Sequence, residues 1–359
     1  MKLGDPGVLP STWRGAIGKA HQRVNMVNYE KSEEIVKYLK LKEDYNKNFE
    51  LIDCYPGCGV WSRALHKHLQ PKAHIMLESF DNYYSWNKDG YNRDLGTSKI
   101  IPVDPYKWKV YNLLERYGAY KPEHVPLDRV NKSLLYTGQF TTAQGGQLLS
   151  QFITCIAYRN WIQKFGRIRM LLWVRDTAAF RAIATPEEPS RGKLSALVSL
   201  FANVDVVAAS DASDFKRQDT KTGKLLEKMP ALRNAPIKFS ADDTFMKGPL
   251  VLLDIKPKEQ REWESEMSAH EMEYVLRNLF ITPKMQLRTS INTLGPGAGE
   301  YFESRLGHLY DKTTHHLTPD EFVQIFQAFK VWPYKPEHLF DLGEDDLDSR
   351  TRRDIIQFI

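Results

Sequence analysis

Cysteine is scarce in this sequence. Only three cysteines, Cys54, Cys58 and Cys155, stand among 359 residues. A secreted disulfide scaffold is usually small and rich in cysteine, so this count argues against one and favours a reducing compartment. Cys54 and Cys58 lack the second cysteine pair or the clustered histidines that would complete a metal site. We therefore expect these cysteines to be packing residues, and we expect no metal.

Long apolar runs are also lacking. The longest clean run, Met170–Val174, has the length of a strand, whereas a helix that spans a bilayer needs about 18 to 20 residues. We expect no membrane span. Charge is only modestly in excess, because 50 Lys and Arg residues face 45 Asp and Glu residues, a net charge of +5. With 42% hydrophobic and 26% charged residues the composition is that of a globular protein, and the length predicts about two domains.

The basic residues are concentrated in two segments. Residues 164–193 include seven basic and three acidic residues, and residues 216–238 include seven and two. Charge runs are usually solvated faces, so on their own they give nucleic-acid binding only a slight preference. The first 24 residues hold four basic residues and one acid. That composition fits either an acid-poor organellar address or an unstructured N-terminal arm.

Strand-sized apolar runs alternate with helical stretches through the first two thirds of the chain. This alternation predicts an α/β fold with a mainly parallel sheet flanked by helices. Between two of the runs, Leu194, Leu197, Val198 and Phe201 have the spacing of a one-faced helix. The expected strands are residues 51–54, 74–77, 99–103, 133–136, 167–174 and 204–208, and residues 249–255 form a last strand that returns to the sheet.

The character of the sequence changes near Pro257, where strand-like runs stop and helical spacing takes over. A later helix is predicted from Phe322, Ile325, Phe326 and Phe329, after an N-cap at Thr318 and Pro319 at the first helical position. Residues 211–234 are polar, lysine-rich and without clear periodicity, so we expect a flexible basic insertion. The expected division is an N-terminal arm (1–24), a sheet domain (25–256), a helical domain (257–342) and a mobile C-terminal tail (343–359).

A short glycine turn follows the first long strand, in the run Asp53-Cys54-Tyr55-Pro56-Gly57-Cys58-Gly59. A strand, a tight glycine turn and a helix are where a nucleotide-like ligand meets backbone N–H groups in an open α/β sheet. Gly57 and Gly59 alone are weak evidence, because a structural connection has the same pattern. Glu78 and Asp104 end the next two strands, in positions to bind ribose hydroxyls and an adenine amino group.

These motifs resemble those of the ribosomal RNA adenine N6-dimethyltransferase superfamily. The resemblance rests on residues 53–59, on Glu78 and Asp104, on residues 191–198, and on an opening motif at residues 25–28. It implies a Rossmann-like class I methyltransferase sheet followed by a small helical domain. The residues that it marks as a vestigial S-adenosylmethionine site are Met26, Asp53, Gly57, Gly59, Glu78, Asp104 and Gln139.

Methyl transfer itself is expected to be lost. Where the methyltransferases have the first glycine of the turn, this sequence has Tyr55, whose side chain restricts the backbone and fills space. Where they have Asn, an apolar residue, Pro and an aromatic residue to grip the target adenine, it has Gln139-Phe140-Thr141-Thr142. We therefore expect no enzyme activity and no required cofactor. Residual S-adenosylmethionine binding through Glu78, Asp104 and Gln139 stays open.

The sequence is still more similar to the branch of this superfamily that serves as specificity factors of the single-subunit mitochondrial RNA polymerase. Matching segments include residues 104–108, 160–173, 282–295 and 332–336. The resemblance implies an initiation factor of the mitochondrial matrix that acts as a monomer in a heterodimer with that polymerase, confers promoter specificity and stabilises melted promoter DNA. The alternatives are an active rRNA adenine dimethyltransferase and a scaffold that no longer binds nucleic acid.

Holding melted DNA requires aromatic faces interleaved with basic groups. Tyr106 and Trp108, with Lys107 between them, supply both beside the former active site, and we expect them to stack on the melted non-template strand. Alternate aromatic residues after a strand are also often core residues. The expected phosphate contacts are Arg167, Arg169, Arg175, Arg181, Arg191 and Lys193, although some of these could pair with acids of the polymerase.

Overall fold

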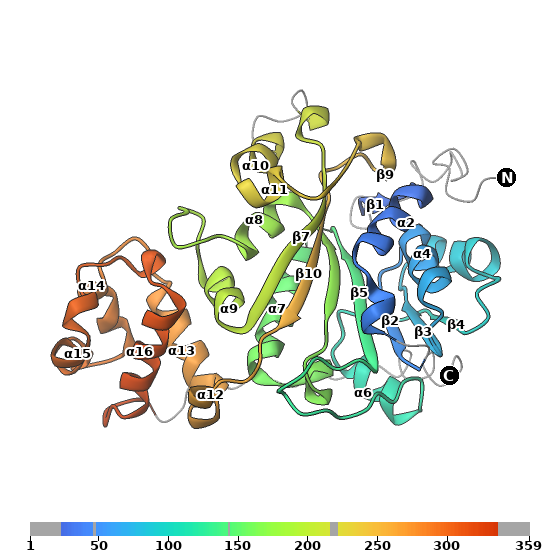
Figure 1. Ribbon diagram of the computed structural model, residues 1–359. Helices are drawn as coiled ribbons and strands as arrows, with labels where there is room; N and C mark the ends of the chain where they lie inside the picture. The colour runs from blue at the N-terminus through green and yellow to red at the C-terminus, as the bar shows by residue number, and fades with distance from the viewer. Residues whose placement is uncertain (1–22, 46–47, 143, 216–221, 337–359) are drawn as a thin grey trace.

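A computed structural model describes residues 23–45, 48–142, 144–215 and 222–336 (Figure 1). Its centre is an eight-stranded sheet. The strands lie in the order β4 (Ser98–Ile101), β3 (Ala73–Leu77), β2 (Glu50–Cys54), β5 (Leu134–Phe140), β6 (Met170–Val174), β10 (Val251–Pro257), β7 (Ala202–Ser210) and β8 (Ile237–Phe239).

The sheet is mainly parallel. Strands β4, β3, β2, β5 and β6 pair in parallel, and β10 runs antiparallel between β6 and β7. The α/β prediction is confirmed, and all seven expected strands are present with slightly different ends. Three short strands were not expected from the apolar runs, namely the edge strand β8 and the two-residue pair β1 (Asn25–Met26) and β9 (Thr244–Phe245).

Helices cover both faces of the sheet, which is why its strands read as continuous apolar runs. On one face, α2 (Tyr29–Tyr38) and α4 (Val60–Leu69) pack against residues such as Leu51 and Trp173, and the rings of Trp61 and Trp173 meet edge to face at 5.5 Å. On the other face, α6 (Lys109–Arg116), α7 (Gly145–Tyr158) and α9 (Lys193–Phe201) share one apolar core with sheet residues such as Ile52 and Leu253. Figure 1 shows these two layers.

Every described element after β10 is helical. The longest are α13 (Ala269–Leu279), α15 (Ala298–Leu306) and α16 (Pro319–Lys330), with α12 (Glu262–Glu266) and α14 (Leu287–Ser290) as short connections. The predicted start of α16 is confirmed. Thr318 accepts a hydrogen bond from the backbone of Glu321, whose carboxylate accepts one from the Thr318 N–H at 2.9 Å.

The helical part shares one continuous apolar core with the sheet part. Trp263 connects the two, because its ring lies 6.1 Å from that of Phe201 in α9 and 5.8 Å from that of Phe326 in α16. Burial of aromatic surface between the parts therefore holds the helical part on the α7 and α9 side of the sheet (Figure 1).

The expectation of a flexible insertion at residues 211–234 is wrong for its described part. That part contains α10 (Thr222–Lys228) and α11 (Pro230–Arg233). Phe215, Leu226, Met229 and Leu232 are buried in the main core, and the last three are spaced three residues apart, as on one face of a helix. Residues 1–22 of the expected arm (1–24), residues 337–342 at the end of the expected helical domain and the expected tail (343–359) lie outside the described residues. Among the helices that the structure describes, none has the length and apolarity to cross a membrane.

Candidate functional site

The candidate site lies at the carboxyl ends of β2, β3 and β5, around the turn that joins β2 to α4. Gly57 and Gly59 both have left-handed backbones, with φ of +58° and +77°. A Cβ on Gly57 would lie 1.8 Å from Oδ1 of Asn25, and one on Gly59 would lie 1.9 Å from Oδ1 of Asn87. A larger residue at either position would therefore clash with an asparagine side chain of this same chain, because these asparagines pack directly on the turn.

Tyr55 has the backbone conformation that a glycine would adopt at the start of this turn, with φ of +56°. Left-handed geometry is unfavourable for a residue with a bulky side chain. The Tyr55 hydroxyl donates to Oδ1 of Asp104 at 2.5 Å, and the same oxygen accepts from the N–H of Tyr106 at 3.0 Å. Burial and the charge of Asp104 raise the pKa of the Tyr55 hydroxyl well above its ordinary value, so it stays protonated and acts as the donor.

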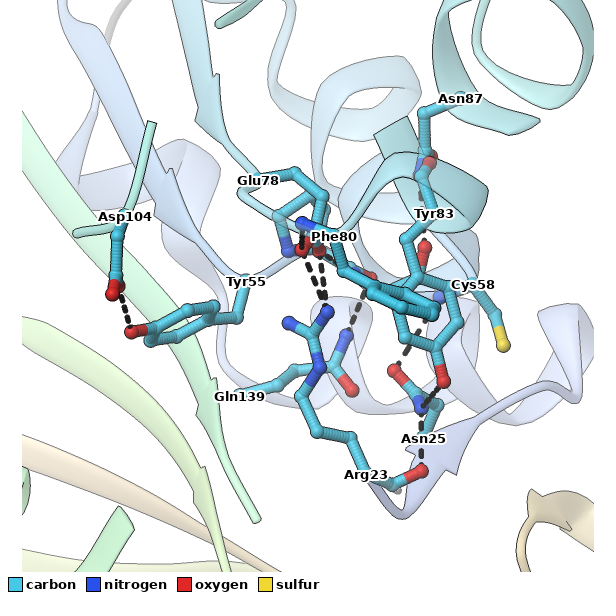
Figure 2. A network of polar contacts seen from close by, with 12 residues as sticks. Arg23, Asn25, Tyr55, Cys58, Glu78, Phe80, Tyr83, Asn87, Asp104 and Gln139 are labelled. Atoms are coloured by element: carbon cyan, nitrogen blue, oxygen red, sulfur yellow. Dashed lines mark hydrogen bonds and ion pairs between the residues drawn. The ribbon is translucent and has the colours of Figure 1, made fainter. Parts of the chain in front are cut away.

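Glu78, at the end of β3, is fully buried and pairs with Arg23. One guanidinium nitrogen of Arg23 lies 2.7 and 2.8 Å from the two carboxylate oxygens, and Arg23 is only 2% exposed. The guanidinium also lies over two rings, 4.5 Å from the centroid of Tyr83 and 5.0 Å from that of Tyr55. Figure 2 shows Arg23 reaching into the site and pointing at Glu78.

The backbone donors of the turn are also used within the chain. The N–H of Gly57 donates to Glu78 at 3.2 Å, that of Cys58 to Oδ1 of Asn25 at 3.3 Å, and that of Gly59 to the Pro56 carbonyl at 2.9 Å. In nucleotide-binding folds such amides face the ligand. Here they complete a network of side chains and turn (Figure 2).

Two residues expected at the cofactor site have other positions. The carboxylate of Asp53 lies 3.5 Å from Nε2 of His74, which in turn contacts His66 of α4, so Asp53 faces the helical layer. Met26 is buried in β1, which pairs with β9. Gln139 does lie at the site, where its amide donates to the Pro56 carbonyl at 2.7 Å.

The loop that corresponds to the adenine grip of the methyltransferases is closed. Gln139, Phe140 and Thr141 are at most 1% exposed. The ring of Phe140 packs on Phe152 in the core, and the Thr141 hydroxyl donates to the Val24 carbonyl at 3.0 Å. These three residues therefore present no stacking face to a base.

Two arginines expected to contact phosphate, Arg169 and Arg191, are buried on partners within the chain, which corrects the expectation for these two, and Lys193 also has a partner. Arg169 is 4% exposed and pairs with Asp254 through two hydrogen bonds, at 2.8 and 2.7 Å. Arg191 is 3% exposed and donates to the Leu317 carbonyl of the helical part at 3.0 Å. Lys193 pairs with Glu273 of α13 at 3.1 Å. The two arginines hold the fold together, because the desolvation of a buried guanidinium is offset only by such partners.

The remaining expected cations lie at opposite ends of the sheet. Arg167 precedes β6, at the amino ends of the parallel strands, where its guanidinium donates to the carbonyls of Pro257 and Asp128. Arg175 follows β6 at the site end and donates to the Thr141 carbonyl at 2.9 Å. Arg181, in α8 (Asp176–Ala182), is exposed. The sequence segment therefore does not form a single basic patch.

Tyr106, Lys107 and Trp108 are all partly buried, just after Asp104. The ring of Trp108 meets those of Phe152 and Trp161 edge to face, at 5.3 and 5.6 Å. Trp108 is therefore part of the aromatic core on this side of the sheet, which agrees with the alternative interpretation of the sequence. Tyr106 is also partly buried and packs against the same core, so only part of its side chain is exposed.

Arg23 and Asn25 are site residues that the sequence does not predict. The composition of the first 24 residues places Arg23 in a basic arm, and its partner Glu78 is 55 residues away. A usable signal is present, because Arg23 comes just before the motif at residues 25–28 that opens the family resemblance.

Comparisons with known proteins agree with this architecture. Residues 25–330 match the family described as ribosomal RNA adenine dimethylase. A protein of Lachancea kluyveri and one of Saccharomyces paradoxus, both named mitochondrial transcription factor 1, are 29% and 31% identical to this chain. The matches cover 86% and 84% of this chain, and 88% and 86% of the relatives. A dimethyladenosine transferase of Plasmodium falciparum has a similar fold, with a TM-score of 0.52 at 15% identity over 84% of this chain and 94% of its own.

Proposed function

The chain belongs to the ribosomal RNA adenine dimethylase family, and from this premise we propose that it is a mitochondrial transcription initiation factor. Its relatives named mitochondrial transcription factor 1 match it over more than four fifths of its length, which supports this assignment. In this proposal the chain works in the mitochondrial matrix as a monomer, binds the single-subunit mitochondrial RNA polymerase, directs it to promoters and stabilises melted promoter DNA. It needs no cofactor.

The closed loop at residues 139–142 carries the choice between this function and methyl transfer. A methyltransferase that acts on a base must extrude that base into a pocket and stack it there. Here Gln139 and Thr141 donate to backbone carbonyls of Pro56 and Val24, and Phe140 faces the core. The loop keeps its place in the fold, but Gln139, Phe140 and Thr141 are at most 1% exposed, and the Gln139 Oε1 atom, which has no hydrogen-bond partner among the described residues, is itself buried.

The surface beside this loop supports a contact with single-stranded DNA. Tyr106 follows Asp104 closely, its backbone N–H is fixed by that carboxylate, and Lys107 comes next. An aromatic ring beside a cation suits an unpaired base and its phosphate, and stacking on one base contributes about 1–3 kcal/mol. We assign Tyr106 to the melted non-template strand.

Promoter-dependent transcription tests the proposed function. Run-off transcription from a linear mitochondrial promoter by the cognate polymerase is measured with and without the chain, and methyl transfer to ribosomal RNA is measured in parallel. We expect initiation to depend on the chain and methyl transfer to be absent. Methylation of adenines at enzyme-like turnover, or initiation that is the same without the chain, would overturn the proposal.

Tyr106→Ala tests the assigned contact with a matched control. Tyr117 is 39% exposed and follows the last residue of α6, at the opposite end of that helix from Asp104, so Tyr117→Ala removes an exposed tyrosine away from the site. We expect Tyr106→Ala to reduce initiation on duplex promoters roughly tenfold, the weight of about 1.4 kcal/mol of stacking. A pre-melted promoter should restore it. Equal activity of the two variants on duplex DNA would contradict the contact.

A further inference from the structure

We infer that this chain has filled the S-adenosylmethionine site of its fold with its own side chains, Arg23 and Tyr55, so that the cofactor does not bind. The inference goes beyond the proposed function and does not depend on it. It concerns the two carboxylates, Glu78 and Asp104, that stand where the fold presents acids to a ribose and an adenine.

Glu78 has no capacity left for a ribose. A carboxylate offers about four acceptor positions on its two oxygens. Glu78 accepts two contacts from Arg23 at 2.7 and 2.8 Å, one from the N–H of Gly57 at 3.2 Å and one from the N–H of Phe80 at 3.0 Å. Because these donors surround a fully buried carboxylate, a hydroxyl would have to displace one of them.

Asp104 is engaged in the same way by Tyr55. The Tyr55 hydroxyl donates to Oδ1 of Asp104 at 2.5 Å, and the same oxygen accepts from the N–H of Tyr106 at 3.0 Å. Figure 2 shows the ring of Tyr55 extending from the turn to Asp104, with Arg23 and Glu78 on its other side. The space between the two acids, where a nucleoside would lie, is therefore occupied by a phenol ring.

The two occupants support each other. The guanidinium of Arg23 lies 5.0 Å from the centroid of the Tyr55 ring and 4.5 Å from that of Tyr83, within the range of cation–π attraction. Arg23 also places a positive charge inside the site. S-adenosylmethionine brings a sulfonium cation, and a second positive charge in a buried site is unfavourable.

The left-handed backbone of Tyr55 is consistent with this replacement. A side chain at φ of +56° is strained relative to glycine, and such strain persists only where the surroundings hold it. The bond to Asp104 and the contact with Arg23 are those surroundings. Arg23 is thus a positioning residue. It holds the Tyr55 ring in place and links the segment before β1 to Glu78 at the end of β3.

Opening the site by substitution tests the inference. Isothermal titration with S-adenosylmethionine and S-adenosylhomocysteine is done on the full chain, on Tyr55→Gly/Arg23→Ala, and on Arg169→Met. The last variant is the matched control, because it also removes a buried arginine–carboxylate pair but at the opposite end of the sheet. We expect neither compound to bind detectably to the wild type or to the control, and the double variant to bind at least roughly tenfold more tightly than the detection limit of the titration.

Three results would overturn the inference. These are binding of either compound by the wild type as tight as by the double variant, equal binding by the control, and no gain in a folded double variant. If the double variant does not fold, the same titration is done on the single variant Tyr55→Gly, which keeps the ion pair of Arg23 and Glu78. The affinity of Tyr55→Gly for the two compounds should exceed that of the wild type, and an unchanged affinity would also refute the inference. Promoter-dependent transcription is measured without either compound, so the test of the proposed function does not depend on the outcome of this titration.

Discussion

Arg169 and Asp254 form a bidentate ion pair, with nitrogen–oxygen distances of 2.8 and 2.7 Å. Arg169 immediately precedes β6, and Asp254 lies in the neighbouring antiparallel strand β10. Both residues are at most 4% exposed. An Arg–carboxylate pair of this geometry is among the stronger hydrogen-bonded contacts in proteins, and removing one member leaves a charge buried without its main partner.

Arg169→Met should therefore lower the free energy of unfolding by about 3–5 kcal/mol, as measured by urea denaturation. Arg169→Met/Asp254→Leu should recover most of that stability, because it also removes the Asp254 carboxylate, which the single variant leaves buried with only the partly exposed Lys256, at 3.1 Å, as an ionic partner. DNA affinity of the folded single variant should be unchanged. A stable Arg169→Met protein with weakened DNA binding would show that the guanidinium serves the ligand instead.

Arg181 is the exposed cation among those expected to contact phosphate. Each neutralised phosphate releases counterions, so binding of a protein to DNA weakens with salt in proportion to the contacts made. Arg181→Ala should lower the slope of log affinity against log salt by about one unit, as measured by fluorescence anisotropy on melted promoter DNA. Arg191→Ala, which removes a buried cation, is the comparison, and an equal change in slope for both variants would refute the assignment.

Glu273 holds the helical part to the sheet part through two donors. The Tyr158 hydroxyl at the end of α7 lies 2.5 Å from one carboxylate oxygen, and Nζ of Lys193 in α9 lies 3.1 Å from the other. Hydrogen bonds to charged groups contribute about 1.5–3 kcal/mol, whereas partly exposed ion pairs contribute about 0.2–1 kcal/mol. Glu273→Ala should therefore cost about 1–3 kcal/mol, and Lys193→Ala less than about 1 kcal/mol.

Amide hydrogen exchange in α13 measures this difference. Glu273→Ala should speed exchange in α13 more than in the strands, because the Glu273 carboxylate joins α13 to the helices α7 and α9. Tyr158→Phe should reproduce most of the effect. If Lys193→Ala accelerates exchange in α13 as much as Glu273→Ala does, the ion pair dominates and this division of the energy is wrong.

The sheet could be predicted from the sequence because its strands are buried on both faces. Residues 51–54 and 170–174 read as nearly unbroken apolar runs for that reason. The edge strand β8 could not be predicted, since it has only three residues and follows a polar, lysine-rich segment. Short elements of this kind are fixed by tertiary contacts and leave little local signal.

The sequence predicts where the candidate site lies, but not that the chain's own side chains occupy it. The pattern at residues 53–59 with Glu78 and Asp104 locates the edge of the sheet, and Tyr55 marks the departure from the family. That Arg23 fills the site could not be read, because its pairing with Glu78 joins residues 55 positions apart. The burial of Arg169 was hidden for the same reason, since Asp254 is 85 positions away.

Acid should destabilise the fold through His66. Burial, and then the neighbouring His74, lower the pKa of His66 from its ordinary value of 6.5 to about 4. Lys67 and Arg63 act in the same direction, and Asp94 opposes them. Because the folded state resists the proton that the unfolded state accepts, stability is full above about pH 6.5 and falls as the pH is lowered through about 4.

We expect that decrease to be about 2–3 kcal/mol at most, with His66→Gln largely free of it. Urea unfolding of both proteins across this pH range measures the difference, and NMR titration of the imidazole checks the pKa directly. A His66 pKa near 6.5 in the folded protein would remove the basis of the prediction.

Asp176 works in the opposite direction. It is 2% exposed at the start of α8, and burial raises the pKa of its carboxyl to about 6. One carboxylate oxygen accepts from the Thr177 N–H at 2.8 Å, and the other has no hydrogen-bond partner among the described residues. The folded state therefore favours the protonated acid, and its stability falls as the pH rises from about 4 through about 6.

Asp176→Asn should remove that penalty and stabilise the protein by about 1–2 kcal/mol above pH 6 to 7, a gain that fades below about pH 4. Between about pH 4 and 6 the opposite trends of His66 and Asp176 partly cancel in the wild type, so a flat pH profile there would not separate them. Unfolding curves of the two single variants separate the two effects. The stability of His66→Gln should fall with rising pH, and the stability of Asp176→Asn should rise. Parallel profiles for the two variants would show that neither group carries the assigned proton.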